Sequence, residues 1–185
     1  MRLPACWPFL IAAASVVTLA HVADRKLSPY HFVAVTPGRL YRSGQLSERE
    51  LEEVVSRYRI KTVVSLQSLD DEFQPWRRGE LETCRRLGVT HVDISMQWEE
   101  PPSAEQLGRW RALTSDPARG PILVHCQHGV VRTGMMVAVY ELDRGRPRAE
   151  VLESLPTFGH RLTQRRHPLM WRFLREYSPP QAAVK

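Results

Sequence analysis

The residues with the clearest chemical potential lie in one short segment, residues 125–134, which reads His-Cys-Gln-His-Gly-Val-Val-Arg-Thr-Gly. An apolar run precedes this segment at 121–124, and a helix-compatible apolar stretch follows it at 135–140. The pattern predicts a strand, a tight loop and a helix, with Cys126 at the end of the strand. Backbone amides of such a loop converge on one point and favour an anion there. The same field lowers the pKa of a cysteine, so Cys126 can act as a thiolate nucleophile at neutral pH.

Arg132 stands where the helix begins and adds a planar fork of donors suited to two oxygens of a phosphate. A buried, inert cysteine would not need a glycine-containing loop that ends in Arg-Thr-Gly. The segment therefore predicts an oxyanion cradle with a nucleophile at its floor.

Residues 125–134 resemble the His-Cys-x5-Arg-Thr-Gly signature of cysteine-dependent protein tyrosine and dual-specificity phosphatases. Residues 40–46, Leu-Tyr-Arg-Ser-Gly-Gln-Leu, are similar to the "yRSgQ" segment of the small atypical dual-specificity group found in bacteria, fungi and plants. Residues 61–66 look like that group's next strand, so the resemblance covers about residues 40–140. It implies hydrolysis of phosphate monoesters without a metal or cofactor, through a phosphocysteine formed on Cys126.

The resemblance also implies roles for the neighbours of Cys126. Thr133 would help the thiolate leave in the second step, and His125 would fix the loop geometry and support the low pKa of the cysteine. The substrate phosphate would be bound by the loop and by the arginine, that is by Gln127, His128, Gly129, Val130, Val131 and Arg132.

A leaving alkoxide or phenolate needs a proton, so a general acid is expected on a neighbouring loop. The wider family places an aspartate in the loop after the strand that precedes the cysteine strand. Here that loop is residues 97–102, and Trp98 stands near the matching position. Glu99 and Glu100 are equal candidates and Asp93 is the third, followed by Asp70 and Asp71. The alternative is that the two glutamates simply belong to a solvated loop.

The predicted substrate is a phosphorylated protein, carrying phosphotyrosine and also phosphoserine or phosphothreonine, or a small phosphoester. Members that act on inositol pyrophosphates typically carry lysines inside the cysteine loop, and this chain has none there. Two other classes stay open: a rhodanese-like sulfur transferase or arsenate-type cysteine enzyme, and a non-catalytic phosphate-binding module.

Elsewhere the chain alternates between strand and helix patterns, which predicts an α/β fold of three layers with a central, mainly parallel sheet flanked by helices. The expected strands are 31–35, 40–41, 60–66, 89–96 and the run that ends at Cys126. Capping-box patterns at Ser47 and Ser103 predict two helix starts. Further helices are expected at 76–87, from the cysteine loop to about Gly145, at 149–155 and at 167–177.

The net charge of +6 is concentrated at one end of the chain. Residues 144–185 hold 9 basic and 3 acidic side chains, which indicates either an anionic partner or a solvated helical face. No nucleic-acid-binding motif accompanies this excess, so a nucleic-acid partner is not expected. Three widely spaced cysteines, Cys6, Cys84 and Cys126, form neither a disulfide framework nor a metal-ligand pattern.

The N-terminal residues differ from the rest, because no charge occurs from Leu3 to Ala20. This segment predicts a single membrane anchor, or alternatively a signal peptide cleaved near Ala20 that leads to export. The expected organisation is an anchor or signal peptide at 1–26, a phosphatase domain at 27–178 and a tail at 179–185.

Overall fold

The computed structural model describes residues 29–68, 75–98, 100–155, 158–160 and 162–180. The strands are β1 (Val33–Thr36), β2 (Leu40–Ser43), β3 (Thr62–Ser65), β4 (Thr90–Asp93) and β5 (Ile122–His125). The helices are α2 (Glu48–Tyr58), α3 (Pro75–Leu87), α4 (Ala104–Ser115), α5 (Val131–Asp143), α6 (Arg148–Ser154) and α7 (Pro168–Glu176), with a short 3₁₀ helix η2 (Pro117–Arg119).

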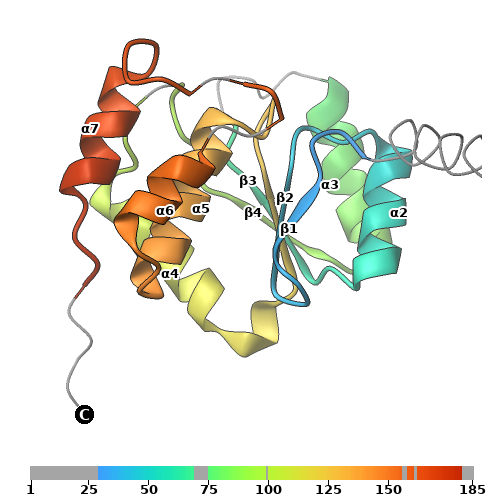
Figure 1. Ribbon diagram of the computed structural model, residues 1–185. Coiled ribbons are helices and arrows are strands. Elements are labelled where there is room, and N and C mark those ends of the chain that lie inside the picture. Colours follow the sequence, from blue (N-terminus) through green and yellow to red (C-terminus); the bar gives the residue numbers. More distant parts are fainter. Residues whose placement is uncertain (1–28, 69–74, 99, 156–157, 161, 181–185) are drawn as a thin grey trace, which may run out of the picture.

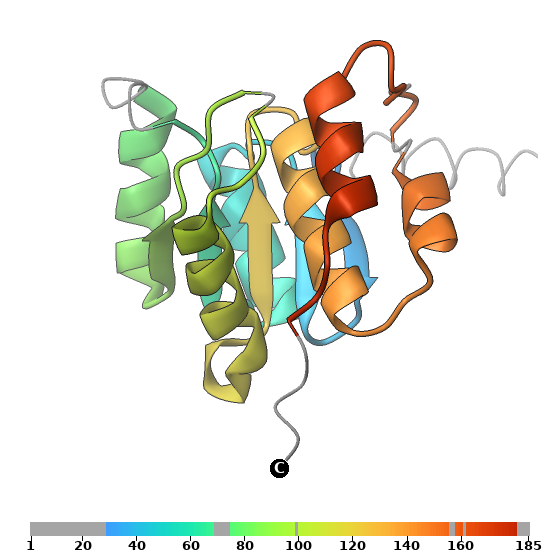
Figure 2. The same cartoon turned by 90° about the vertical axis from the view of Figure 1, so that its left-hand side faces the viewer.

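The strands form one sheet in the order β1-β2-β5-β3-β4, in which only β1 runs antiparallel to its neighbour. Helices α2 and α3 cover one face of the sheet and α4 to α7 cover the other (Figure 1 and Figure 2). The predicted three-layer α/β fold with a mainly parallel sheet is confirmed.

The core has two parts, one on each face of the sheet. Leu123 of β5 packs with the residues of α2 and α3, whereas Ile122 and Val124 pack with those of α4 to α7. All four residues of β5 are buried, as expected for the central strand of a sheet that is covered on both faces.

The register of the central strands brings their carboxyl ends level. Ser43 of β2 and Ser65 of β3 both pair with His125 of β5. The segments that follow these three strands therefore emerge together at one edge of the sheet, where parallel α/β folds place their sites.

Local signals account for the helix boundaries. Both predicted capping boxes are present, with Ser47 and Ser103 accepting hydrogen bonds from the third helical amide. Gly88, with a φ of +67°, follows the last residue of α3.

Strands β3 and β4 are shorter than the predicted 60–66 and 89–96 because regular ladder pairing stops before those ends, whereas β2 extends two residues beyond the predicted 40–41. Beyond Ser65 and Asp93 only single bonds continue, such as that from the Met96 amide to the Leu66 carbonyl (3.3 Å). The first predicted strand begins two residues late, at Val33, because His31 adopts a left-handed conformation with a φ of +53°.

Within the described residues, no helix is long and apolar enough to cross a membrane. The predicted anchor or signal peptide at 1–26 lies outside the described residues, and the domain boundaries stay predictions.

Candidate active site

Cys126 directly follows β5 and lies at the floor of a cavity of about 520 Å³. Only 2% of the residue is exposed. Four parts of the chain line the cavity: Ser68 after β3; Gln97 and Trp98 after β4; residues 126–128 and 130–132 of the loop and helix start; and His160, Leu162, Arg166 and His167 ahead of α7.

The loop between β5 and α5 turns sharply at Gly129. This residue has a φ of +68°, and a Cβ there would overlap the carbonyl of Ser43. Both the backbone conformation and the lack of space therefore require glycine. The turn lets the amides of Gly129 and Thr133 hydrogen-bond to the sulfur of Cys126.

The thiol of Cys126 is acidified by its surroundings. Burial is the largest influence and raises its pKa, but the Thr133 hydroxyl, the Arg132 guanidinium and the amides of Thr133 and Gly129 lower it. The net result is a pKa below the ordinary value of 9.0. The surroundings of Cys126 thus favour the thiolate form that the sequence predicts.

Arg132 is held in place over the loop by two carbonyls. Its Nη1 atom lies 3.4 Å from the carbonyl oxygens of Leu66 and Met96, and the side chain is buried. These bonds leave other donors of the guanidinium at the cavity, which Arg132 lines together with Cys126. The structure thus brings both predicted residues to one site.

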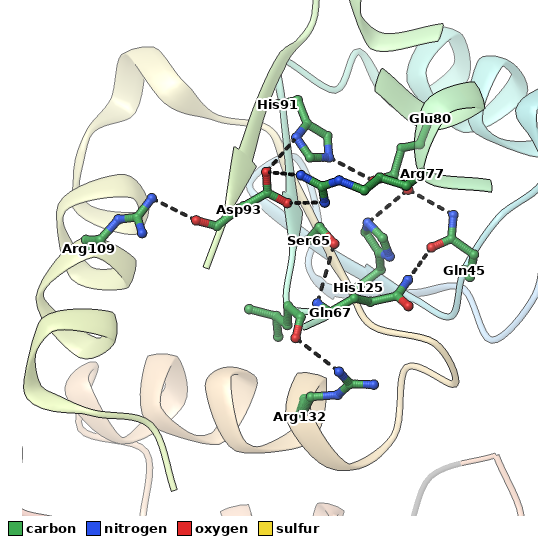
Figure 3. A network of polar contacts seen from close by, with 11 residues as sticks. Gln45, Ser65, Gln67, Arg77, Glu80, His91, Asp93, Arg109, His125 and Arg132 are labelled. Carbon is green, nitrogen blue, oxygen red and sulfur yellow. Dashed lines mark hydrogen bonds and ion pairs between the residues drawn. The ribbon is translucent and has the colours of Figure 1, made fainter. Parts of the chain in front are cut away.

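Behind Cys126 lies a buried charge network that Figure 3 shows from close by. His125 Nε2 lies 3.1 Å from Glu80 Oε2, and His91 Nε2 lies 2.8 Å from Glu80 Oε1. Gln45 Nε2 also donates to Glu80 Oε2, at 2.9 Å. The carboxylate of Glu80 therefore holds His125 from behind, on the side away from α5.

The network shifts the pKa of both partners. Burial by itself lowers the pKa of His125, but the Glu80 carboxylate and the Cys126 thiolate raise it above its usual value. Burial raises the pKa of Glu80, whereas His125 and His91 lower it, and the net pKa lies below its usual range. A protonated His125 facing a charged Glu80 is the arrangement that both shifts favour.

Sequence reasoning missed Glu80, although a signal for it exists. Glu80 occupies the buried face of α3 together with Thr83 and Cys84. A carboxylate on the core-facing stripe of a helix needs a buried partner. The position of Glu80 on this buried face would have identified it, whereas a count of the charges in the chain does not.

Of the general-acid candidates, the structure describes Glu100 and Asp93, and neither lines the cavity. Glu100 is exposed and does not line the cavity. Asp93 accepts from Arg77 Nη1 at 2.8 Å and Nη2 at 2.9 Å, and it does not line the cavity either. Glu99, Asp70 and Asp71 lie outside the described residues. The assignment of the acid to Glu99 or Glu100 stays a prediction.

Three basic residues ahead of α7 were not predicted as part of the site. His160, Arg166 and His167 line the cavity. Arg166 belongs to the basic excess of residues 144–185, so part of that excess lies at the site.

Among the described residues there is no group of three or more His, Cys, Asp or Glu side chains that could hold a metal ion.

A cysteine beneath converging amides and an arginine, at the end of the central strand of a parallel sheet, defines the cysteine-dependent phosphatase class. The family described as "DSP-PTPase phosphatase fused to NAD+ Kinase" matches residues 11–167, and the chain belongs to this family. The predicted membership in the atypical dual-specificity phosphatases is confirmed, and with it the assignment as a phosphatase.

Relatives include the dual specificity protein phosphatase TpbA of Pseudomonas aeruginosa, strain UCBPP-PA14. It is 29% identical over 174 residues, which cover 85% of this chain and 75% of TpbA. The probable chloroplastic NAD kinase 2 of Oryza sativa is 32% identical over 131 residues. That match covers 71% of this chain but 13% of the rice protein, so the likeness concerns a small part of the kinase.

Solved structures share the fold. The catalytic domain of the inositol pyrophosphate phosphatase SIW14 of Saccharomyces cerevisiae superimposes with a TM-score of 0.70. It is 19% identical, and the match covers 84% of this chain and 90% of that domain. A cysteine-to-serine variant of P. aeruginosa TpbA in complex with phosphotyrosine gives a TM-score of 0.58 at 23% identity, covering 82% of this chain and 93% of TpbA.

Proposed function

We propose that this protein hydrolyses phosphate monoesters through a phosphocysteine intermediate on Cys126. The observation that carries the proposal is that Cys126 and Arg132 line the same cavity, where Arg132, Thr133 and the Gly129 amide are close enough to the sulfur to lower its pKa. These groups lower the pKa of the nucleophile and supply the donors that a phosphoryl group needs.

In the first step the thiolate attacks phosphorus in line, the S–P bond forms and the ester oxygen leaves with its electron pair. Arg132 and the loop amides stabilise the charge on the equatorial oxygens, which is electrostatic preorganisation. A water molecule then attacks phosphorus and releases inorganic phosphate. The Thr133 hydroxyl stabilises the departing thiolate in this second step.

The substrate we favour is a phosphotyrosine side chain, with phosphoserine and phosphothreonine as further substrates. Cys126 is buried at the floor of the cavity, so a substrate has to extend its phosphate inward from the mouth. Trp98, Val131 and Leu162 provide apolar wall for an aromatic ring on that path. The binding of phosphotyrosine by TpbA supports this choice.

A second candidate is a small molecule with several phosphates. It is favoured by His160, Arg166 and His167, which line the cavity beyond the cysteine loop, and by the activity in the name of the relative SIW14, an inositol diphosphatase. The cysteine loop argues against this substrate, because it carries Gln127 and His128 and none of the lysines that are typical of family members acting on inositol pyrophosphates.

Turnover by the full chain tests both candidates. The substrates are a phosphotyrosine peptide, a phosphoserine peptide, an inositol pyrophosphate and an aryl phosphate. We expect Cys126→Ser and Arg132→Lys to abolish turnover of all of them, because an ammonium cannot replace the bidentate guanidinium. Turnover by Cys126→Ser above trace level would refute the proposed nucleophile.

The double variant His160→Asn/Arg166→Gln separates the two substrate classes. If the phosphotyrosine peptide is the main substrate, kcat/KM on it should change by less than about threefold. A loss confined to the inositol pyrophosphate, with a higher kcat/KM on that substrate in the unsubstituted protein, would favour the second candidate.

A further inference from the structure

The cysteine loop can direct its amides inward only if its carbonyl groups point outward. Buried or partly buried carbonyl groups that face away from a ligand still need donors. In this structure three consecutive loop carbonyls find theirs in the segment that precedes α2. The carbonyl oxygen of Gln127 accepts from the backbone N–H of Gln45 (3.0 Å). The carbonyl oxygen of His128 accepts from His31 Nδ1 (2.7 Å), and that of Gly129 accepts from Arg42 Nη2 (2.5 Å). We call these three donors, Gln45, His31 and Arg42, the carbonyl clamp.

The ring of His31 is fixed from both sides. It stacks on Tyr30 with a centroid separation of 4.1 Å and on Phe158 with a separation of 4.3 Å. Tyr30 OH in turn lies 3.2 Å from Nδ1 of His128. Because a carbonyl oxygen only accepts, Nδ1 of His31 has to carry the proton in this contact. Stacking therefore aims a donor at the loop.

Arg42 is joined to the same stack. Its guanidinium carbon lies 5.6 Å from the centroid of Phe158, within reach of a cation–π contact. Phe158 thus contacts both side-chain donors of the clamp, one through stacking and one through its ring face. The clamp is a connected unit rather than three separate bonds.

We propose that His31 is a positioning residue for phosphate binding and catalysis. By holding the His128 carbonyl outward, His31 keeps the peptide between His128 and Gly129 turned so that the Gly129 amide faces Cys126. Rotation of that peptide would remove one donor from the cradle and expose the nucleophile to a carbonyl dipole of the wrong sign. The role rests on the proposed phosphatase function but concerns a residue outside the cavity lining.

A matched pair of substitutions isolates the donor. In His31→Asn the amide nitrogen can take the place of Nδ1, and in His31→Asp the side chain of nearly the same shape can only accept. Both residues tolerate the positive φ of this position, and both lose the stacking. The pair therefore differs in the donor and in one negative charge.

Two readouts are used: kcat and KM on an aryl phosphate, and the affinity for inorganic tungstate in a Cys126→Ser background. We expect His31→Asp to lower kcat and to weaken tungstate binding, each by about tenfold or more. His31→Asn should stay within about threefold of the unsubstituted protein in both. Measurements at low and high salt separate the added charge, because screening reduces a charge effect but not the loss of a donor.

Equal kcat and equal tungstate affinity in the Asn and Asp variants would overturn the role of His31. So would a difference between the two variants that disappears at high salt. Failure of the proposed function has a different signature, since the protein with unsubstituted His31 would then neither turn over the aryl phosphate nor bind tungstate. Thermal unfolding of each variant identifies one that has lost its fold, and in that case His31→Gly replaces His31→Asp as the variant without a donor.

Discussion

At the scale of single residues, the chemistry of Cys126 depends on a competition between burial and polar contacts. Burial alone would keep a thiol protonated, and the Thr133 hydroxyl, the Arg132 guanidinium and the two amides reverse that effect. His125 is arranged in a related way, because Glu80 compensates the burial of its charged form. The site therefore depends on a few buried partners rather than on general basicity.

Glu80→Gln tests this dependence through stability against pH. The pKa of Glu80 is lowered from 4.5, so its contribution to stability is present above about pH 4.5 and is lost as the pH falls through its folded pKa. The pKa of His125 is raised from 6.5, so its contribution is complete below about pH 6.5 and is lost as the pH rises through its folded pKa. The pair is fully stabilising between these limits.

We therefore expect Glu80→Gln to lower the free energy of unfolding by about 3 kcal/mol near pH 6 and by clearly less at pH 9. Urea unfolding at the two pH values measures the difference. Glu153→Gln, at an exposed position on α6, serves as the control and should have little effect at either pH. A loss of the same size at both pH values would show that the carboxylate does not act through the charge of His125.

At the residue scale, the sequence allowed residues to be predicted as neighbours where one motif held all of them. Cys126, Arg132, Thr133 and His125 lie within residues 125–133, so local spacing was enough to place them together. Glu80 and His31 could not be found in this way. The contacts of Glu80 depend on which face of α3 is buried. Those of His31 depend on its own left-handed conformation ahead of β1. Packing of the whole domain determines both features.

At the scale of elements, the site is produced by the common end of β2, β5 and β3 and by the turn into α5. The apolar run ahead of Cys126 predicted β5, and the capping-box patterns at Ser47 and Ser103 predicted the starts of α2 and α4. The ends of the strands were less predictable, because strand length is set by the pairing partner rather than by the strand's own sequence. The close approach of the turn to β2 depends on Gly129.

Gly129→Ala should disrupt the cradle, because a methyl group there overlaps the Ser43 carbonyl. Gly145→Ala is the matched control, since Gly145 has a φ of +80° and nothing within 4 Å of the added carbon. Both variants carry the strain of a positive φ, about 1 kcal/mol, but only Gly129→Ala has to move the loop. We expect a drop in kcat of at least about 100-fold for Gly129→Ala and an unchanged kcat for Gly145→Ala. Similar kcat values for the two variants would show that the close packing is dispensable.

The loop between β4 and α4 carries the general-acid prediction. A positioned acid contributes about 10²–10⁴-fold, but only when the leaving group is poor. Whichever of Glu99→Gln and Glu100→Gln removes the acid should reduce turnover of a phosphopeptide strongly and that of an activated aryl ester weakly. It should also flatten the alkaline limb of the pH–rate profile. Unchanged phosphopeptide turnover in both variants would exclude these two residues.

At the scale of the whole molecule, four parts of the chain meet at one cavity above the central strand. The sequence predicted the layers and the mainly parallel sheet, because strand and helix patterns alternate regularly. It did not predict that His160, Arg166 and His167 reach the cavity. These residues lie ahead of α7, which packs against α5, and no periodic pattern in the sequence singles them out.

For the intact chain we further propose that residues 1–26 hold the protein at a membrane. The support is the uncharged stretch from Leu3 to Ala20, which is close to the minimum length for a span. The full chain should then sediment with membranes and resist extraction by high salt and by alkaline washing. Recovery of a chain that begins near His21 in the non-membrane fraction would instead establish a cleaved signal peptide.

Trapping the phosphoenzyme tests the central proposal most directly. The full chain is mixed with an aryl phosphate, quenched in acid within the first turnover, digested and analysed by mass spectrometry. We predict one phosphoryl group on the peptide that contains Cys126. In Thr133→Val, where hydrolysis of the phosphocysteine should be slower, we also predict a burst of phenol equal in amount to the enzyme. Phenol release without phosphorus on Cys126, or with phosphorus on another residue, would contradict the account.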